Sequence, residues 1–211
     1  MASVTRPRSR QLKRRAEIEA AVLAATERLL ADGVGFTELG VLRIVAEAGV
    51  ARSSFYMCFP DKVTVLVRLV GNMKDELFGI ATRWRPTGPD GGLDSLAAAF
   101  GEQLAYYRLR APLLAAVAEV SAYDPTLREA TTRAIDRVAQ HLTNVLTEEQ
   151  HAGRTPADID PVVAGRVLAW GGEQIIARQI TIGDPDDDTA VAWDMARSQW
   201  YGTYRRRTED R

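Results

Sequence analysis

The stretch GVARSSFYMCFPDK, residues 49–62, brings hydrogen-bond donors and aromatic rings close together. Phe55 and Phe59 are spaced i and i+4, so on a short helix they share one face, which we expect to point inward. The opposite face then carries a guanidinium, a hydroxyl, a phenol and a thioether, on Arg52, Ser53, Tyr56 and Met57. A guanidinium can bind O6 and N7 of guanine, and a hydroxyl can meet any base edge in the major groove of DNA. These residue types predict contact with duplex DNA.

The neighbouring segments must hold this short helix in place, because a helix of eight or nine residues is unstable alone in water. Segment 40–48 predicts a preceding helix with Ile44 and Val45 inward, and Gly49 fits a tight turn after it. Two short helices joined by such a turn form a helix-turn-helix, whose second helix fits a major groove about 12 Å wide. Asp61 is the expected N-cap of the next helix, and Lys62 beside that helix end would attract a phosphate.

The charge distribution also indicates that the N-terminal part of the chain contacts DNA. Residues 1–15 carry six basic side chains and no acidic one, and residues 1–62 carry ten basic and seven acidic ones. The remainder carries seventeen basic and twenty-one acidic side chains. A positive head on an acidic body indicates that the head meets a polyanion. The alternative is that segment 1–15 is simply a solvated, disordered tail.

Helical spacing of apolar residues continues along nearly the whole chain, and no alternating run is long enough for a sheet. Ile18, Val22, Ala25 and Leu29 form the stripe of the first helix. Further helices are expected over 61–83, 93–109, 112–123, 125–153, 162–182 and 189–206. We therefore expect an all-α protein of about nine helices. The expected domains are a basic flexible arm (1–15), a three-helix helix-turn-helix DNA-binding domain (16–62) and a helical ligand-binding and dimerisation domain (63–211).

At the quoted stretch the sequence resembles a known family. FTELGVLRIVAEAGVARSSFYMCFPDKVTVL is similar to the DNA-binding region of TetR family transcriptional regulators, over roughly residues 15–65. The typical pattern there reads I-A-x-x-A-G-V-S, then x-x-T/S-L/F-Y-x-H/Y-F-x-x-K. The resemblance implies that Tyr56 and Lys62 contact phosphates and that Arg52, Ser53 and Met57 face bases. The full set of expected DNA-binding residues is Arg52, Ser53, Tyr56, Met57, Lys62, Gly40, Arg43 and Arg14.

Three positions depart from the family pattern. Ala51 replaces the serine that usually caps the recognition helix, which should weaken that helix by about 1 kcal/mol. Cys58 stands where a histidine or tyrosine often reaches the DNA backbone, and Gly40 stands where Ser or Thr usually caps the preceding helix. These departures keep a second reading open, a helical dimeric module that binds a small molecule or a protein and whose DNA-binding head is degenerate.

The resemblance implies that the downstream helices form a ligand-binding domain. Its last two long helices, about 162–182 and 189–206, are expected to pair with a second subunit as a four-helix bundle. The segment AWGGEQIIARQI, residues 169–180, is weakly similar to the EthR-like branch of mycobacterial repressors. The glycine pair Gly171-Gly172 costs helix stability and indicates the close approach of a partner helix or of a ligand.

A ligand cavity needs apolar walls with a few polar groups. Each candidate wall residue is more often ordinary core than ligand wall, and a largely hydrophobic small effector is expected. The predicted ligand-binding residues are Phe100, Leu104, Tyr107, Leu114, Val117, Trp170, Gln174 and Glu173.

Other classes of function find little in the sequence. A single cysteine, Cys58, excludes a disulfide framework, and His141 and His151 lack neighbours at metal-ligand spacing, so no metal or cofactor is expected. No P-loop, G-x-S-x-G or G-x-G-x-x-G motif occurs, and we expect no enzymatic activity. No apolar run approaches a membrane span, and no export signal is apparent. We therefore expect a cytoplasmic, ligand-responsive repressor that binds a pseudo-palindromic operator as a homodimer.

Overall fold

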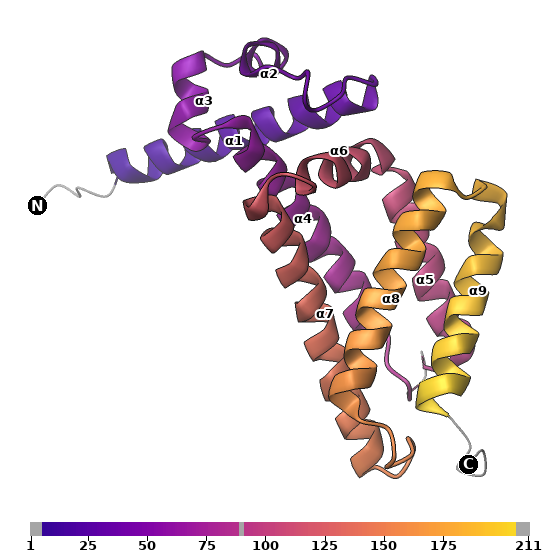
Figure 1. Cartoon of the computed structure of the whole chain (residues 1–211). Helices are drawn as coiled ribbons and strands as arrows, with labels where there is room; N and C mark the ends of the chain where they lie inside the picture. Colours follow the sequence, from indigo (N-terminus) through magenta and orange to yellow (C-terminus); the bar gives the residue numbers. More distant parts are fainter. Residues whose placement is uncertain (1–5, 89–90, 206–211) are drawn as a thin grey trace, which may run out of the picture. The chain divides into compact units, whose positions relative to one another are not determined.

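The computed structural model describes residues 6–88 and 91–205, and within them it contains nine α-helices and no strand. This confirms the all-α fold. The helices are α1 (Arg6–Ala31), α2 (Val41–Ala48), α3 (Arg52–Cys58), α4 (Lys62–Arg83), α5 (Leu93–Arg108), α6 (Ala111–Ser121), α7 (Pro125–His151), α8 (Pro161–Ile182) and α9 (Asp188–Gln199) (Figure 1). A 3₁₀ turn, η1 (Pro185–Asp187), precedes α9, and a π-helical turn, η2 (Trp200–Tyr204), follows it.

The helices divide into two compact units. Unit 1 comprises residues 1–72 and 112–128, and unit 2 comprises residues 73–111 and 129–211. The predicted division after residue 62 therefore differs from this one, since the first half of α4 and all but the first residue of α6 belong to unit 1. The reason is the length of α4, whose buried stripe continues without a break from Leu66 through Val70 and Met73 to Leu77.

Unit 1 is built around α1, which contacts both α2 and α3 (Figure 1). The predicted stripe of α1 is confirmed, because Ile18, Val22, Ala25 and Leu29 are all buried. On the outside, Arg28 of α1 pairs with Glu47 of α2 over 2.8 Å. These contacts give the short helices α2 and α3 the support that they lack alone.

Helix α1 begins earlier than its apolar stripe suggests. The segment expected to be a flexible arm is helical from Arg6 onward, and residues 1–5 of that segment lie outside the described part of the chain. Arginine, lysine, glutamine and leucine, which fill residues 10–15, are strong helix formers. Their intrinsic preference extends the helix beyond the turns that bury apolar surface.

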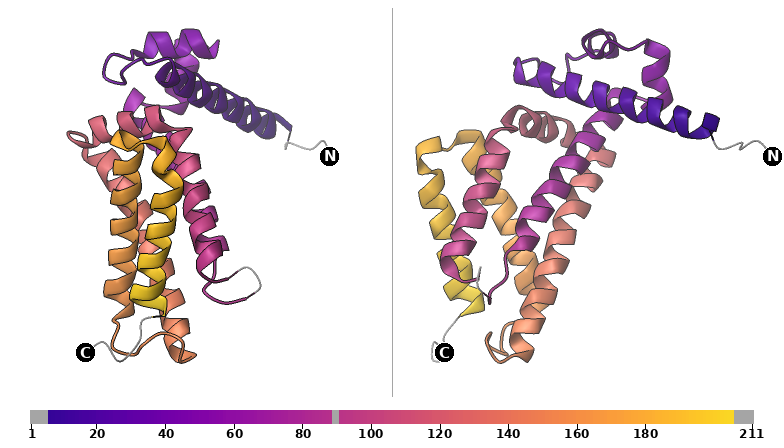
Figure 2. Two further views of the ribbon diagram at one scale, coloured as in Figure 1. Left: turned by 90° about the vertical axis from the view of Figure 1, so that its right-hand side faces the viewer. Right: turned by 180° about the vertical axis from the view of Figure 1, so that it is seen from behind.

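Unit 2 is a bundle of helices that lie side by side (Figures 1 and 2). Helix α5 packs against α8 and α9, and Ile135 and Ala139 of α7 share a buried cluster with Ala169 of α8. Gly165 of α8 lies directly against α7, since a Cβ there would lie 2.8 Å from the carbonyl oxygen of Ala139. Asp160 is the N-cap of α8, and its side chain accepts from the amides of Val162 and Val163.

The end of the last helix departs from expectation, because α9 stops at Gln199 and the backbone widens into a π turn. There the amide of Arg205 donates to the carbonyl of Trp200 over 2.7 Å. The ring of Trp84 meets both Trp200 and Tyr204 edge-on, with centroids 6.4 and 5.2 Å away. The aromatic contacts fix the position of this turn within unit 2.

Within residues 6–88 and 91–205, none of the helices combines the length and the apolar character needed to cross a membrane. Nor do three or more histidine, cysteine, aspartate or glutamate side chains come together there as a metal site would require.

Candidate nucleic-acid interface and ligand cavity

The turn between α2 and α3 has the geometry that the sequence predicts. Gly49 adopts a left-handed conformation with φ 66°, which a residue with a side chain rarely takes. Its amide donates to the carbonyl of Ala46, and the amide of Val50 donates to that of Val45 over 3.1 Å. These bonds end α2 and redirect the chain into α3.

Helix α3 separates a buried face from an exposed face. Phe55 and Phe59 are 0% and 1% exposed, and their ring centroids lie 5.6 Å apart. The four predicted contact residues Arg52, Ser53, Tyr56 and Met57 are all exposed. The helix therefore presents the side chains that the sequence assigns to DNA, with its two phenylalanines directed to the core.

Arg52 is available for an external partner. Its guanidinium carbon lies 5.6 Å from the centroid of the Tyr56 ring. Within the described residues, no carboxylate comes within salt-bridge distance of Arg52, Arg43 or Arg14. All three side chains are exposed, Arg14 on α1 and Arg43 on α2.

The helix N-termini of this motif lack side-chain caps. Gly40 precedes α2 and Ala51 precedes α3, both in extended conformation, and neither supplies a capping hydrogen bond. Cys58 is half-buried, and its thiol donates to the carbonyl of Arg15 over 3.7 Å. Cys58 therefore joins α3 to α1, and its placement agrees with an ordinary, partly buried thiol.

Lys62 has a position that differs from the one the resemblance implies. Its ammonium group donates to the carbonyl oxygens of Phe36, Thr37 and Leu39 over 2.9, 2.9 and 3.1 Å. A lysine ammonium has three donors, so all three are used inside unit 1. The structure thus gives Lys62 the role of fixing the loop between α1 and α2, and a phosphate could bind it only by displacing one of these carbonyls. Asp61 does cap α4 as predicted, accepting from the Thr64 amide over 2.7 Å.

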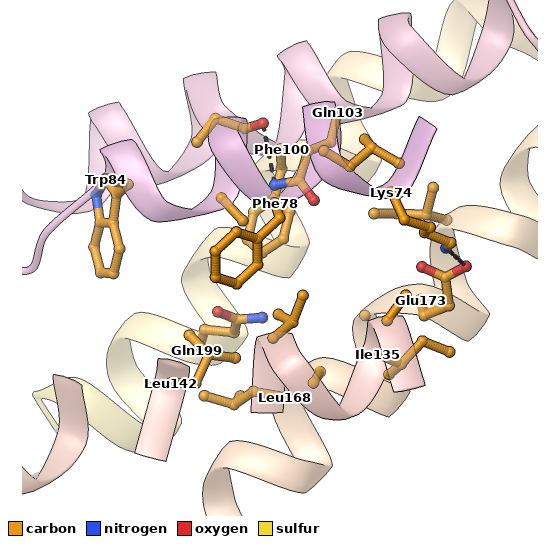
Figure 3. A pocket seen from close by; sticks show the side chains of 18 of the residues that line it. Lys74, Phe78, Trp84, Phe100, Gln103, Ile135, Leu142, Leu168, Glu173 and Gln199 are labelled. Carbon is orange, nitrogen blue, oxygen red and sulfur yellow. Dashed lines mark hydrogen bonds and ion pairs between the residues drawn. The ribbon is translucent and has the colours of Figure 1, made fainter. Parts of the chain in front are cut away.

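Unit 2 contains a partly open cavity of about 90 Å³. Its walls are largely apolar, and Phe78 and Phe100 contribute aromatic rings to it (Figure 3). Lys74 and Glu173 meet at one end of the cavity, and Trp84 lies toward the other. The polar side chains of Gln103 and Gln199 also line it.

The polar end of the cavity is a closed hydrogen-bonded cluster. The Lys74 ammonium donates to the Tyr107 oxygen over 2.7 Å and to Oε1 of Glu173 over 2.5 Å. The Tyr107 hydroxyl donates to Oε2 of Glu173 over 2.9 Å. Burial, and then the negative charge of Glu173, raise the pKa of Tyr107 far above its ordinary value, so its hydroxyl keeps its proton.

The predicted ligand-binding residues separate into two groups. Phe100, Tyr107 and Glu173 line the cavity. Leu104 is fully buried without lining it, and Gln174 is exposed. The indole of Trp170 donates to Asp136 over 3.2 Å and joins the α7–α8 cluster instead. Two further predicted residues, Leu114 and Val117, belong to unit 1 and do not line this cavity.

The sequence reasoning missed several residues of the cavity wall. They are Lys74, Phe78, Trp84, Gln103, Ile135, Leu142, Leu168, Ile176 and Gln199. Lys74 gives the clearest signal, because it lies within the apolar stripe of α4, four residues after Val70 and three before Leu77. A charged residue at such a position requires a buried partner.

The helix pair α8 and α9 also borders an open groove of about 550 Å³. Gly171 and Gly172 both line this groove, and no atom of another residue lies within 4 Å of a Cβ built at Gly171. The glycine pair therefore leaves space on the surface of unit 2. Val167 and Ile175 on the same helix are 64% and 50% exposed, which makes this side of α8 apolar as well as open.

Comparison with known proteins supports these observations. Residues 22–69 match the family model described as "Bacterial regulatory proteins, tetR family". No curated protein sequence matches the chain significantly.

Solved structures resemble the chain over most of its length. SmeT of Stenotrophomonas maltophilia, the repressor of the multidrug efflux pump SmeDEF, is 18% identical with a TM-score of 0.66, covering 89% of this chain and 91% of SmeT. A TetR-family transcriptional regulator from Streptomyces coelicolor is 22% identical with a TM-score of 0.62, covering 86% and 93%. The regulatory protein TetR from Rhodobacter sphaeroides is 20% identical with a TM-score of 0.63, covering 84% and 96%. Residues 22–69 thus match the DNA-binding domain of the TetR family, and the chain has the all-α fold of TetR-family transcriptional regulators.

Proposed function

We propose that this chain is a ligand-responsive transcriptional repressor that binds a pseudo-palindromic operator as a homodimer. The observation that carries the proposal is the exposed face of α3, where Arg52 has no carboxylate partner among the described residues. Two such helices would enter successive major grooves, about 34 Å apart along the duplex. The proposal makes the chain a regulator without enzymatic activity, which acts in the cytoplasm; its place in the EthR-like branch stays a prediction.

The proposed dimer forms through α8 and α9. The groove beside these helices and the exposed apolar side chains of Val167 and Ile175 support this choice, because a large exposed apolar patch marks a surface for association. Sedimentation velocity tests it. Ile175→Glu should give a monomer, whereas Leu109→Glu, which changes an exposed leucine outside the groove, should leave the dimer intact.

The proposed effector site is the cavity of unit 2. Its apolar walls and its single polar cluster have the composition of a ligand site. An effector would release DNA only to the extent that it binds the free and the DNA-bound conformations with different affinity.

A second candidate function is a helical module with a degenerate DNA-binding head. The three carbonyl bonds of Lys62 and the uncapped ends at Gly40 and Ala51 favour it, because each removes a phosphate contact or a stabilising bond that the family pattern supplies.

Selection of binding sites from random duplex DNA separates the two candidates. The repressor proposal expects enrichment of a pseudo-palindrome whose half-sites lie about one helical turn apart. It also expects affinity to fall steeply with salt, in proportion to the number of phosphates contacted. If no duplex is enriched above non-specific binding, the degenerate-head candidate replaces it.

A further inference from the structure

We propose that the cavity of unit 2 receives a small carboxylic acid, whose carboxylate replaces that of Glu173 on Lys74 and Tyr107. In the chain without ligand, the carboxylate of Glu173 on α8 would then occupy the place of the ligand's carboxylate. Only the description of this molecule as an effector rests on the proposed function, because its binding to unit 2 does not require DNA.

The first argument is the arrangement of donors around Glu173. Lys74 donates to one carboxylate oxygen and Tyr107 donates to the other, over 2.5 and 2.9 Å. The two donors come from different helices, α4 and α5, and converge on one carboxylate from α8. Figure 3 shows the Lys74–Glu173 pair. A charged donor on one oxygen and a hydroxyl on the other give a carboxylate two hydrogen bonds, one of them charge-assisted and therefore strong.

The second argument is which member of the cluster can move. The side chains of Lys74 and Glu173 are 8% and 20% exposed, and Tyr107 is 2% exposed. Arg137 holds the α4 backbone here by donating to the carbonyl of Lys74 over 3.4 Å and pairing with Asp75 over 2.7 Å. Glu173 is the most exposed member, so its carboxylate is the one that can turn toward water while the donors stay.

The sign of the ligand's charge follows from the same geometry. Burial raises the pKa of Tyr107, and the charge of Glu173 raises it further, so the hydroxyl remains a donor. A cationic ligand would have to reach Glu173 against the ammonium of Lys74, which lies 2.5 Å from its oxygen. An anionic ligand instead meets one positive charge and one hydroxyl that are already in place.

The apolar walls limit the size of the rest of the molecule. The cavity measures about 90 Å³, whereas an apolar cavity of roughly 150 Å³ is known to hold benzene. Phe78, Phe100 and Leu142 line the space beyond the polar cluster. A short aliphatic acid fits this description, and pentanoate serves as the probe.

Calorimetric titration of the full chain with pentanoate, pentanamide and pentylamine tests the proposal. Pentanoate should bind best, because the other two lack the negative charge. Glu173→Gln should tighten pentanoate binding about tenfold by removing the competing charge. Lys74→Met should weaken pentanoate binding at least about tenfold. Tyr107→Phe should also weaken it, and this variant provides the test if Lys74→Met does not fold. Glu102→Gln, which changes an exposed carboxylate outside the cavity, should leave the affinity unchanged.

Three results would overturn the proposal. They are equal binding of the three probes, weaker pentanoate binding by Glu173→Gln than by the wild type, and no pentanoate binding by the wild type and by Glu173→Gln alike. If the wild type binds pentylamine more tightly than pentanoate, and Glu173→Gln loses this binding, the cavity is a cation site instead. Because these titrations contain no DNA, a chain that binds pentanoate but selects no operator would contradict the repressor proposal alone.

Discussion

The ammonium nitrogen of Lys62 lies 2.9 Å from the carbonyl oxygen of Thr37, and the same group reaches the carbonyls of Phe36 and Leu39. The lysine that the family resemblance assigns to a phosphate therefore holds together the loop between α1 and α2. This loop sets where α2 begins, so Lys62 acts on the DNA-binding motif through its folding.

Replacing Lys62 should destabilise the protein. Lys62→Met leaves three carbonyl groups without their charged donor, which should lower the free energy of unfolding by at least about 2 kcal/mol. Urea denaturation followed by circular dichroism measures this. Lys13→Met, at an exposed position on α1, is the matched control and should unfold like wild type. Equal stability of the two variants would show that the carbonyl contacts contribute nothing.

Restoring the missing cap should stabilise the recognition helix. Ala51 is the N-cap of α3 in extended conformation, so a serine hydroxyl there can accept from a free amide of the first turn. Ala51→Ser should raise the free energy of unfolding by about 1 kcal/mol. Ala46→Ser, inside the exposed face of α2, should instead lower it slightly, because serine has the poorer helix propensity. A destabilised Ala51→Ser variant would contradict the assignment of this cap.

Local patterns made the recognition helix predictable from sequence. Phe55 and Phe59 recur at helical spacing, Gly49 marks a left-handed turn, and both signals lie within eleven residues of each other. The environment of Lys62 was not predictable in this way. Its partners are backbone carbonyls 23 to 26 residues away, and a sequence pattern describes side chains rather than the path of a loop.

The cavity illustrates the same limit over longer distances. The sequence predicts Tyr107 as a wall residue and Glu173 as a polar group of the site, but their contacts with Lys74 join residues 33 and 99 positions apart. Helical periodicity gives the inward face of each helix without giving its neighbours. Leu104 was therefore as good a candidate as Phe100 on sequence grounds, although only Phe100 lines the cavity.

The two glycines of α8 should respond in opposite ways to alanine. At Gly165 a Cβ would lie 2.8 Å from the Ala139 carbonyl oxygen and 3.0 Å from the Thr143 amide, so Gly165→Ala should cost about 1–3 kcal/mol of stability. At Gly171 no side chain of the same subunit is close, so Gly171→Ala should add up to about 1 kcal/mol to the stability of one subunit through helix propensity. Thermal unfolding at a fixed protein concentration compares them. A Gly165→Ala variant as stable as Gly171→Ala would mean that α7 and α8 are farther apart.

Acidification should remove the stabilising effect of Asp188. Its carboxylate accepts from Nε and Nη2 of Arg108 over 2.9 and 2.8 Å, and these bonds hold the pKa of Asp188 below its ordinary value. A lowered pKa stabilises the folded state above pH 3.8, and this contribution is lost as the pH falls through the folded-state pKa. Asp188→Asn should therefore lower the urea midpoint at pH 7 and match wild type increasingly well below pH 3.8. Asp186→Asn, at an exposed position nearby, should show no such pH-dependent difference. If the urea midpoint of Asp188→Asn lies below that of the wild type by the same amount at every pH, the charge of Asp188 is not the cause.

The central claim is that the exposed face of α3 reads DNA, and Arg52 tests it most directly. Fluorescence anisotropy on the duplex enriched by selection should show that Arg52→Ala weakens binding by about 1–3 kcal/mol and relaxes the preference at one base pair. Arg133→Ala removes the same charge from an exposed position on α7 and should bind like wild type. Arg52→Ala and Arg133→Ala binding with equal affinity and equal base preference would contradict the claim.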